Sequence, residues 1–183
     1  MLILASQSPR RKALLESKNI EFKTVPSAFD EASVLANSPI EYVKTLARLK
    51  AKSILEHYPN DVILGADTIV LLDQTILGKP KDEHDAFLML KMLRGKRHLV
   101  YTAVSIMNKD KEETWLSYAE VQFKDVSDQD ILSYVKTKEP LDKAGSYGIQ
   151  GLGSFLVASY YGNYHAIMGL PIDEVVEKLK QFS

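Results

Sequence analysis

The chain has 183 residues, a formal net charge of −1 and 45% apolar residues, which fits a globular protein and argues against disorder and stable nucleic-acid binding. It contains no cysteine, which excludes disulfides and thiolate metal sites. No apolar run approaches the roughly 20 residues of a membrane span, and residues 2–5 are too short for a signal peptide, so we expect a cytoplasmic protein with no membrane partner.

Strand-like and helix-like segments alternate along the chain, without an internal repeat or a linker. We therefore predict a single domain over residues 1–183, of the mixed α/β class, with a curved sheet flanked by helices. In chain order we expect a strand at 2–5, a helix at 9–17, a strand at 20–25, an irregular segment at 26–37, a helix from a capping box at 38–41 to about residue 58, strands at 62–72 and 75–77, a helix at 82–94, strands at 98–107 and 113–123, a helix at 127–136, a glycine-rich segment at 141–153, a strand at 154–160 and a helix from 171.

The first loop joins a predicted strand directly to a predicted helix. Ser8 is the expected N-cap, and Pro9 is the first helical residue. Unpaired N–H groups at such a helix start attract phosphate oxygens, and Ser6 and Ser8 add hydroxyl donors. Arg10 and Arg11 add planar guanidinium groups that can hold a phosphate through two hydrogen bonds. The loop is either a phosphate site that lacks P-loop glycines or a plain capped helix start with solvated arginines.

Lys50 lies on the apolar side of its predicted helix. At about 100° per residue, the polar and apolar residues of this helix separate onto opposite sides. Lys50 falls among the apolar residues, whereas Lys52 lies on the polar side. A lysine that faces a core is costly unless it is paired or its ammonium reaches a cleft. Lys50 is therefore a candidate functional residue, with snorkelling as the alternative. The apolar positions are Ile40, Val43, Leu46, Ala47, Ala51 and Ile54.

Asp67 is the one carboxylate in the apolar run "VILGADTIVLL". A strand this apolar is typical of burial on both faces, where an unpaired carboxylate is strongly disfavoured. We expect Asp67 to meet a metal, a cation or a functional cleft, and a structural ion pair is the alternative. Thr68 points to the opposite face of a regular strand, so it shares a ligand with Asp67 only if Gly65 permits a kink.

Three loops carry weaker signals. Lys79 follows Gly78 in a stiff loop and is either a phosphate contact or an ordinary loop lysine. The pair Asp30-Glu31 offers oxygen ligands of the kind that Mg²⁺ prefers, or is a plain acidic surface pair. In "DKAGSYGIQG" the glycines allow close approach of a flat ligand, and Gln150 can donate and accept hydrogen bonds at a base edge, unless this is a structural turn.

Taken together and in order, these stretches resemble the Maf family of nucleoside triphosphate pyrophosphatases, and they span almost the whole chain. The branch that acts on dTTP and UTP carries the glycine-rich motif with alanine where this chain has Ser146, a small-for-small change that we expect to leave activity unaltered. The matching stretches are "LASQSPRRKALL", "DE" at 30–31, "LARLKAKSI", "GADTIV", "LGKPKD", "TAVSI", "EPLDKAGSYGIQG" and "YHAIMGLP".

The resemblance implies two α/β lobes around a central cleft, as in inosine triphosphate pyrophosphatases. It implies hydrolysis of dTTP and UTP between the α and β phosphates, with Mg²⁺ or Mn²⁺ as cofactor and a nucleoside triphosphate as partner. A regulatory role in septum formation or cell-division arrest is the alternative, and the resemblance also suggests a homodimer.

The resemblance assigns roles to positions of this chain. Asp67 matches the proton acceptor, and with Glu31 it is a candidate metal ligand. Arg10, Thr68 and Gln150 match the positions linked to substrate choice. The polar positions of the cleft match Ser8, Arg11, Glu31, Lys50 and Lys79. Ser6 is a further candidate substrate contact because of its place in the first loop.

Overall fold

The computed structural model describes residues 1–182, as a mixed α/β chain. The strands are β1 (Leu2–Leu4), β2 (Phe22–Thr24), β3 (Val62–Leu72), β4 (Thr75–Leu77), β5 (Arg97–Met107), β6 (Glu112–Phe123) and β7 (Val157–Gly162). The α-helices are α1 (Pro9–Ser17), α2 (Pro39–Leu55), α3 (Glu83–Leu93), α4 (Asp128–Lys136), α5 (Tyr164–Ile167) and α6 (Ile172–Leu179). The 3₁₀ turns are η1 (Glu31–Ser33), η2 (Glu139–Asp142), η3 (Ala144–Ser146), η4 (Gly151–Leu156) and η5 (Lys180–Phe182).

The strands form a seven-stranded sheet in the order β2-β1-β3-β5-β6-β7, with β4 paired to β3 off this path. β1 runs parallel to both of its neighbours, β2 and β3. β4 and β7 pair in antiparallel fashion with β3 and β6. The predicted class, an α/β chain with helices flanking a sheet, is confirmed. None of the helices in the described residues combines the length and apolar character that crossing a bilayer requires.

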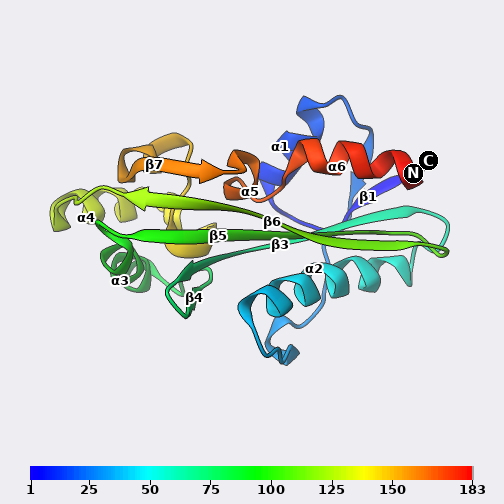
Figure 1. Cartoon of the computed structure of the whole chain (residues 1–183), viewed down its shortest axis with the longest axis horizontal. Helices are drawn as coiled ribbons and strands as arrows, with labels where there is room; N and C mark the ends of the chain where they lie inside the picture. The colour runs from blue at the N-terminus through cyan, green and yellow to red at the C-terminus, as the bar shows by residue number, and fades with distance from the viewer. Residues whose placement is uncertain (183) are drawn as a thin grey trace. The chain divides into compact units, whose positions relative to one another are not determined.

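The chain divides into two compact units, and β3, β5 and β6 contribute residues to both. The first unit contains Met1–Asp67, Thr102–Ser117 and Gly169–Ser183. Within it, α2 lies on one side of the strands and α6 on the other (Figure 1). α2 buries the face that its periodicity predicted, through Val43, Leu46, Ala47, Ala51 and Ile54, although Ile40 in the first turn is 43% exposed.

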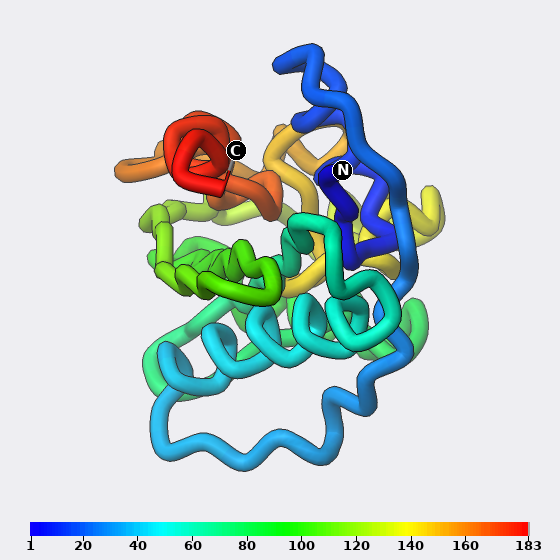
Figure 2. Tube along the Cα trace, turned by 90° about the vertical axis from the view of Figure 1, so that its right-hand side faces the viewer, coloured from blue at the N-terminus to red at the C-terminus, as the bar shows by residue number. Residues whose placement is uncertain are grey.

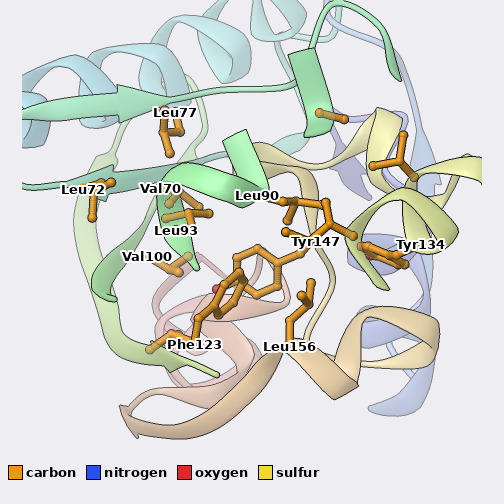
Figure 3. Packing of buried hydrophobic residues seen from close by; sticks show 14 residues of the cluster. Val70, Leu72, Leu77, Leu90, Leu93, Val100, Phe123, Tyr134, Tyr147 and Leu156 are labelled. Atoms are coloured by element: carbon orange, nitrogen blue, oxygen red, sulfur yellow. The ribbon is translucent and has the colours of Figure 1, made fainter. Parts of the chain in front are cut away.

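The second unit contains Thr68–Tyr101 and Tyr118–Met168. Its core joins apolar side chains of α3 and α4 to strand residues and to the glycine-rich segment (Figure 3). Phe123, Tyr134 and Tyr147 are the large aromatic members of this core, and Phe123 and Tyr147 pack edge to face with ring centroids 4.6 Å apart. The glycine-rich segment therefore passes through the core at Gly145, Ser146 and Tyr147, which are buried.

Several element boundaries differ from the prediction for local reasons. α2 ends at Leu55, and its capping box is incomplete because the Glu41 carboxylate accepts from the Asn37 backbone N–H instead of reaching Ser38. β7 starts at Val157 because η4 occupies the preceding residues, and the one-turn helix α5, capped by Asn163, was not predicted. The segment predicted as irregular before α2 contains the turn η1.

Gly65 lets α2 approach β3 closely. A Cβ at this position would lie 2.4 Å from the Ala47 carbonyl oxygen and 2.9 Å from the Ala51 Cβ. β3 runs through Gly65 as one strand, and this helix–strand contact explains why a glycine is present there.

We expect Gly65→Ala to lower the free energy of unfolding by ~1–3 kcal/mol, because α2 has to shift to admit the methyl group. Gly78→Ala is the matched control, since a Cβ at Gly78 would meet nothing within 4 Å, and it should change stability by less than about 0.5 kcal/mol. Urea unfolding of both variants measures the difference, and equal stabilities would contradict the steric explanation.

Candidate active site

The loop between β1 and α1 is held by its own hydroxyl groups. The Ser8 hydroxyl accepts from the Arg11 backbone N–H at 3.5 Å and caps α1 as predicted, with Pro9 in the first turn. The Ser6 hydroxyl, which is buried, accepts from the Ser8 backbone N–H at 3.1 Å and from the Arg11 guanidinium at 3.2 Å. These serines therefore shape the loop in addition to any ligand contact that they make.

Arg11 joins this loop to the segment before α6. Its Nε donates to the Gly169 carbonyl oxygen at 2.7 Å. Burial lowers the pKa of Arg11, and the charges of Asp67 and Glu31 oppose this shift. An arginine stays protonated under such conditions, so Arg11 places a fixed positive charge near both carboxylates. Arg10 adds a second positive charge beside it, which lowers the pKa of Arg11 further.

Lys50 binds two carboxylates at once. Its Nζ lies 2.5 Å from the Asp67 Oδ1 and 2.7 Å from the Glu31 Oε1. The Lys50 and Asp67 side chains are only 14% and 12% exposed, so Lys50 does not snorkel to solvent. Asp67 thus meets a cation, one of the outcomes expected for a carboxylate in this strand.

The second carboxylate comes from the segment that precedes α2. This segment runs alongside α2 before the chain turns into the helix (Figure 2), and Ser27 and Ser53 join the two by a hydrogen bond of 3.0 Å. The two acidic residues at the start of η1 make different contacts. Asp30 accepts from the Ala32 backbone N–H and caps η1, whereas Glu31 reaches Lys50. Of the two, Glu31 is therefore the residue whose side chain contacts Lys50.

The environment of Asp67 favours its neutral form more than water does. Burial raises the pKa of Asp67, while Lys50 and Arg11 oppose the shift and Glu31 adds to it. A carboxyl group with a raised pKa is a better proton acceptor than an ordinary aspartate. A perturbed, buried acid between two cations is typical of functional sites.

Glu31 and Asp67 together fit a divalent cation. Each has a carboxylate oxygen within 2.7 Å of the Lys50 Nζ, so the two carboxylates converge on the same position. Within residues 1–182 no group of three or more His, Asp or Glu side chains gathers that could hold a metal alone. Mg²⁺ commonly binds through one or two carboxylates together with substrate phosphates and water, so two carboxylates are sufficient.

The other predicted residues belong to the second unit. Thr68 follows Asp67 on β3 and is half-buried, and Lys79 and Gln150 are exposed. The Gly145 backbone N–H donates to the Gly78 carbonyl oxygen at 3.0 Å, which places the Lys79 loop beside the glycine-rich segment. The structure thus gathers Ser6, Ser8, Arg10, Arg11, Glu31, Lys50 and Asp67 in the first unit, and Thr68, Lys79 and Gln150 in the second.

Sequence reasoning missed two contributors to the first group. Burial raises the pKa of Tyr42 on α2, and the negative charges of Asp67 and Glu31 raise it further. Tyr42 lies two helical turns before Lys50, and this spacing is the signal that could have identified it. Gly169 contributes only its carbonyl oxygen, which no side-chain pattern could have indicated.

The family described as "Maf-like protein" matches residues 1–182. A dTTP/UTP pyrophosphatase of Acholeplasma laidlawii is 53% identical over 184 residues, covering 100% of this chain and 97% of the relative. A dTTP/UTP pyrophosphatase of Bacillus cytotoxicus is 49% identical, covering 98% and 94%. Among solved structures, a HAM1 protein from Coxiella burnetii matches with a TM-score of 0.55 at 14% identity, covering 98% of each chain. The Staphylococcus aureus Ham1 protein matches with a TM-score of 0.53 at 11% identity, covering 100% and 99%.

We expect Lys50→Met to raise the pKa of Asp67 further, because the cation that stabilises its carboxylate is removed. An acid with a raised pKa in the folded state stabilises the fold at low pH, and this contribution is lost as the pH rises through the folded pKa. The fall in stability between about pH 4 and about pH 8 should therefore be larger in the variant.

Lys52→Met is the control, because it removes the same charge from the exposed side of the same helix. An NMR titration of the Asp67 carboxyl carbon, with unfolding measured at each pH, makes the comparison. The same titration midpoint in both variants would show that Lys50 does not act on Asp67.

Proposed function

This chain belongs to the Maf-like protein family, and from that membership we propose that it is a nucleoside triphosphate pyrophosphatase acting on dTTP and UTP. The products are the nucleoside monophosphate and pyrophosphate. Uridine triphosphates with modified bases are included in the proposal, so that the enzyme keeps non-standard nucleotides out of nucleic acids. The observation that carries the proposal is the buried Asp67 carboxylate, which Lys50 holds beside Glu31 in a chain 53% identical to a relative of that name.

The proposal gives each group of the first unit a task. The loop from Ser6 to Arg11 binds phosphate oxygens through backbone N–H groups, hydroxyls and guanidinium groups. Lys50 neutralises charge that develops on the phosphates during attack by water. Asp67 accepts the proton of that water, as its raised pKa favours. A divalent cation held by Glu31 and Asp67 would screen the phosphate charges and make the attacking water more acidic.

The second unit supplies base recognition in this proposal. Uracil and thymine present a carbonyl, an N3–H donor and a second carbonyl, whereas cytosine replaces the donor by an acceptor and one carbonyl by an amino group. The amide of Gln150 can pair with a carbonyl and the N3–H together. A site built on such hydrogen bonds rejects bases that leave its polar groups unpaired. Arg10 and Thr68 complete the residues that we assign to substrate choice, and Lys79 adds a phosphate contact.

Other parts of the proposal concern the whole protein. We also propose that the protein forms a homodimer, does not bind nucleic acids stably and is located in the cytoplasm. The alternative function, regulation of septum formation or cell-division arrest, finds no support in the names of the relatives described above. A regulator would also have no use for a buried carboxylate held between cations.

Asp67→Asn should remove nearly all turnover while the protein stays folded, because asparagine keeps the shape but loses the basicity and the charge. In the wild type, turnover should fall as the pH is lowered and Asp67 becomes protonated, since only the ionised form accepts a proton. Steady-state hydrolysis across the pH range is the measurement, with Asp110→Asn in an exposed turn as control. Retention of more than about a tenth of the activity, a barrier change under ~1.4 kcal/mol, would rule out an essential role.

The reaction class and the base choice are tested together, by a screen of nucleoside triphosphates with Mg²⁺ or Mn²⁺ and identification of the products. We expect pyrophosphate as the product, and dTTP and UTP as the best substrates, well ahead of CTP, dCTP and purine nucleotides. Orthophosphate as the product would instead indicate a phosphatase.

Gln150→Ala should erode this ranking more than it lowers the best rate, whereas Gln129→Ala on the exposed face of α4 should do neither. A preference for CTP or GTP in the wild type, or an unchanged ranking in Gln150→Ala, would show that this loop does not read the base.

A further inference from the structure

We propose that Glu139 is a positioning residue that fixes the loop carrying Gln150 and thereby sets the base preference. The inference rests on the proposed function, in which Gln150 reads the base. Tyr134, Glu139 and residues 147–153, which carry the inference, all lie in the second unit. Glu139 is the first residue of the matching stretch "EPLDKAGSYGIQG", but neither the resemblance nor its place in the sequence gave it a role.

The Glu139 carboxylate binds the backbone that follows Gln150. Its Oε2 accepts from the Leu152 N–H at 3.2 Å, and its Oε1 accepts from the Gly153 N–H at 3.2 Å. These N–H groups open the 3₁₀ turn η4, which has Gln150 as its N-cap and no capping hydrogen bond from that side chain. Glu139 thus takes the place of a cap and leaves the Gln150 amide out of the turn.

Tyr134 binds the backbone before Gln150, and we call Glu139 and Tyr134 together the clamp. Its hydroxyl donates to the Glu139 Oε1 at 2.9 Å and accepts from the Gly148 N–H at 3.3 Å. Burial raises the pKa of Tyr134, so the phenol keeps the proton that it donates. One carboxylate and one phenol therefore bind backbone on both sides of Gln150.

Gly151 and Gly153 are explained by the short distance between the loop backbone and the clamp. A Cβ at Gly153 would lie 2.5 Å from the Tyr134 hydroxyl and 2.6 Å from the Gly148 carbonyl oxygen. A Cβ at Gly151, where φ is +72°, would lie 3.2 Å from the Glu139 Oε2. Without side chains at these positions, the backbone N–H groups can reach the carboxylate.

The start of the loop is anchored separately in the core. Tyr147 is buried, and its hydroxyl shares a hydrogen bond of 2.8 Å with the Nε2 of His98. Burial lowers the pKa of His98 to about 4, so this histidine is neutral near pH 7 and the anchor does not change there. Gln150 is exposed between the buried anchor and the Glu139 clamp, which is the arrangement of a side chain held out for a ligand.

A carboxylate suits this position better than any neutral side chain. Each of its oxygens accepts, so it can serve Leu152, Gly153 and Tyr134 together. A glutamine of the same shape keeps one acceptor but turns its NH₂ group towards backbone donors. Loss of a charged hydrogen bond of this kind would let the tip of the loop move, and discrimination by Gln150 would fall.

The test is a double-mutant cycle with Glu139→Gln and Gln150→Ala, read out as the ratio of kcat/KM for UTP to that for CTP. We expect Glu139→Gln to lower this ratio by about tenfold, as for loss of one charged hydrogen bond. In the Gln150→Ala background the same change should lower it no further, because Glu139 acts through Gln150. Amide hydrogen exchange at Leu152 and Gly153 should become faster in Glu139→Gln.

Glu120→Gln is the control, since it removes the same charge within the same unit, where Glu120 pairs with Arg97. Tyr134→Phe removes the phenol but keeps the ring, and it tests the same clamp if Glu139→Gln does not fold. An unchanged ratio in Glu139→Gln beside a lowered ratio in Gln150→Ala would overturn this inference alone, as would additive losses. An unchanged ratio in Gln150→Ala would overturn base reading and the role of Glu139 with it.

Discussion

The ion pair between Lys50 and Asp67 is the constraint on which the candidate site depends. It places a charged pair between a helix and a strand that are otherwise apolar where they meet. Burying two charges costs several kcal/mol, and well-packed apolar residues at such positions are often at least as stabilising. A contribution to stability therefore does not explain why this ion pair is present. The pair is better explained as a means of holding a buried carboxylate beside a cation that a ligand can displace.

Much of this site could be predicted from the sequence because its residues break a pattern. Asp67 interrupts an apolar strand, and Lys50 interrupts the apolar side of a helix. Ser8 followed by Pro9 marks a helix start by local chemistry alone. Each signal depends on residues close in sequence, and the structure keeps all three. The regular parts of the fold were predictable for the same reason.

What could not be predicted depends on contacts between distant segments. Nothing in the pair Asp30-Glu31 tells which carboxylate caps its own turn and which reaches a lysine on the next helix. Glu139 looks like an ordinary polar residue at the start of a turn until Leu152 and Gly153 are placed beside it. The start of β7 was misplaced for a related reason, because η4 extends over residues whose composition also suits a strand.

Gly65 has a consequence for chemistry as well as for packing. Residues two apart on a strand share a face, so Gly65 and Asp67 both point towards α2. The missing side chain at Gly65 brings the backbone of α2 near enough for Lys50 to reach Asp67, while Ala47 and Ala51 keep the helix surface low beside it. Gly65 thus sets the distance between α2 and β3, and a lysine side chain is long enough to span that distance. A residue with no functional group thus determines how closely the Lys50 ammonium and the Asp67 carboxylate can approach each other.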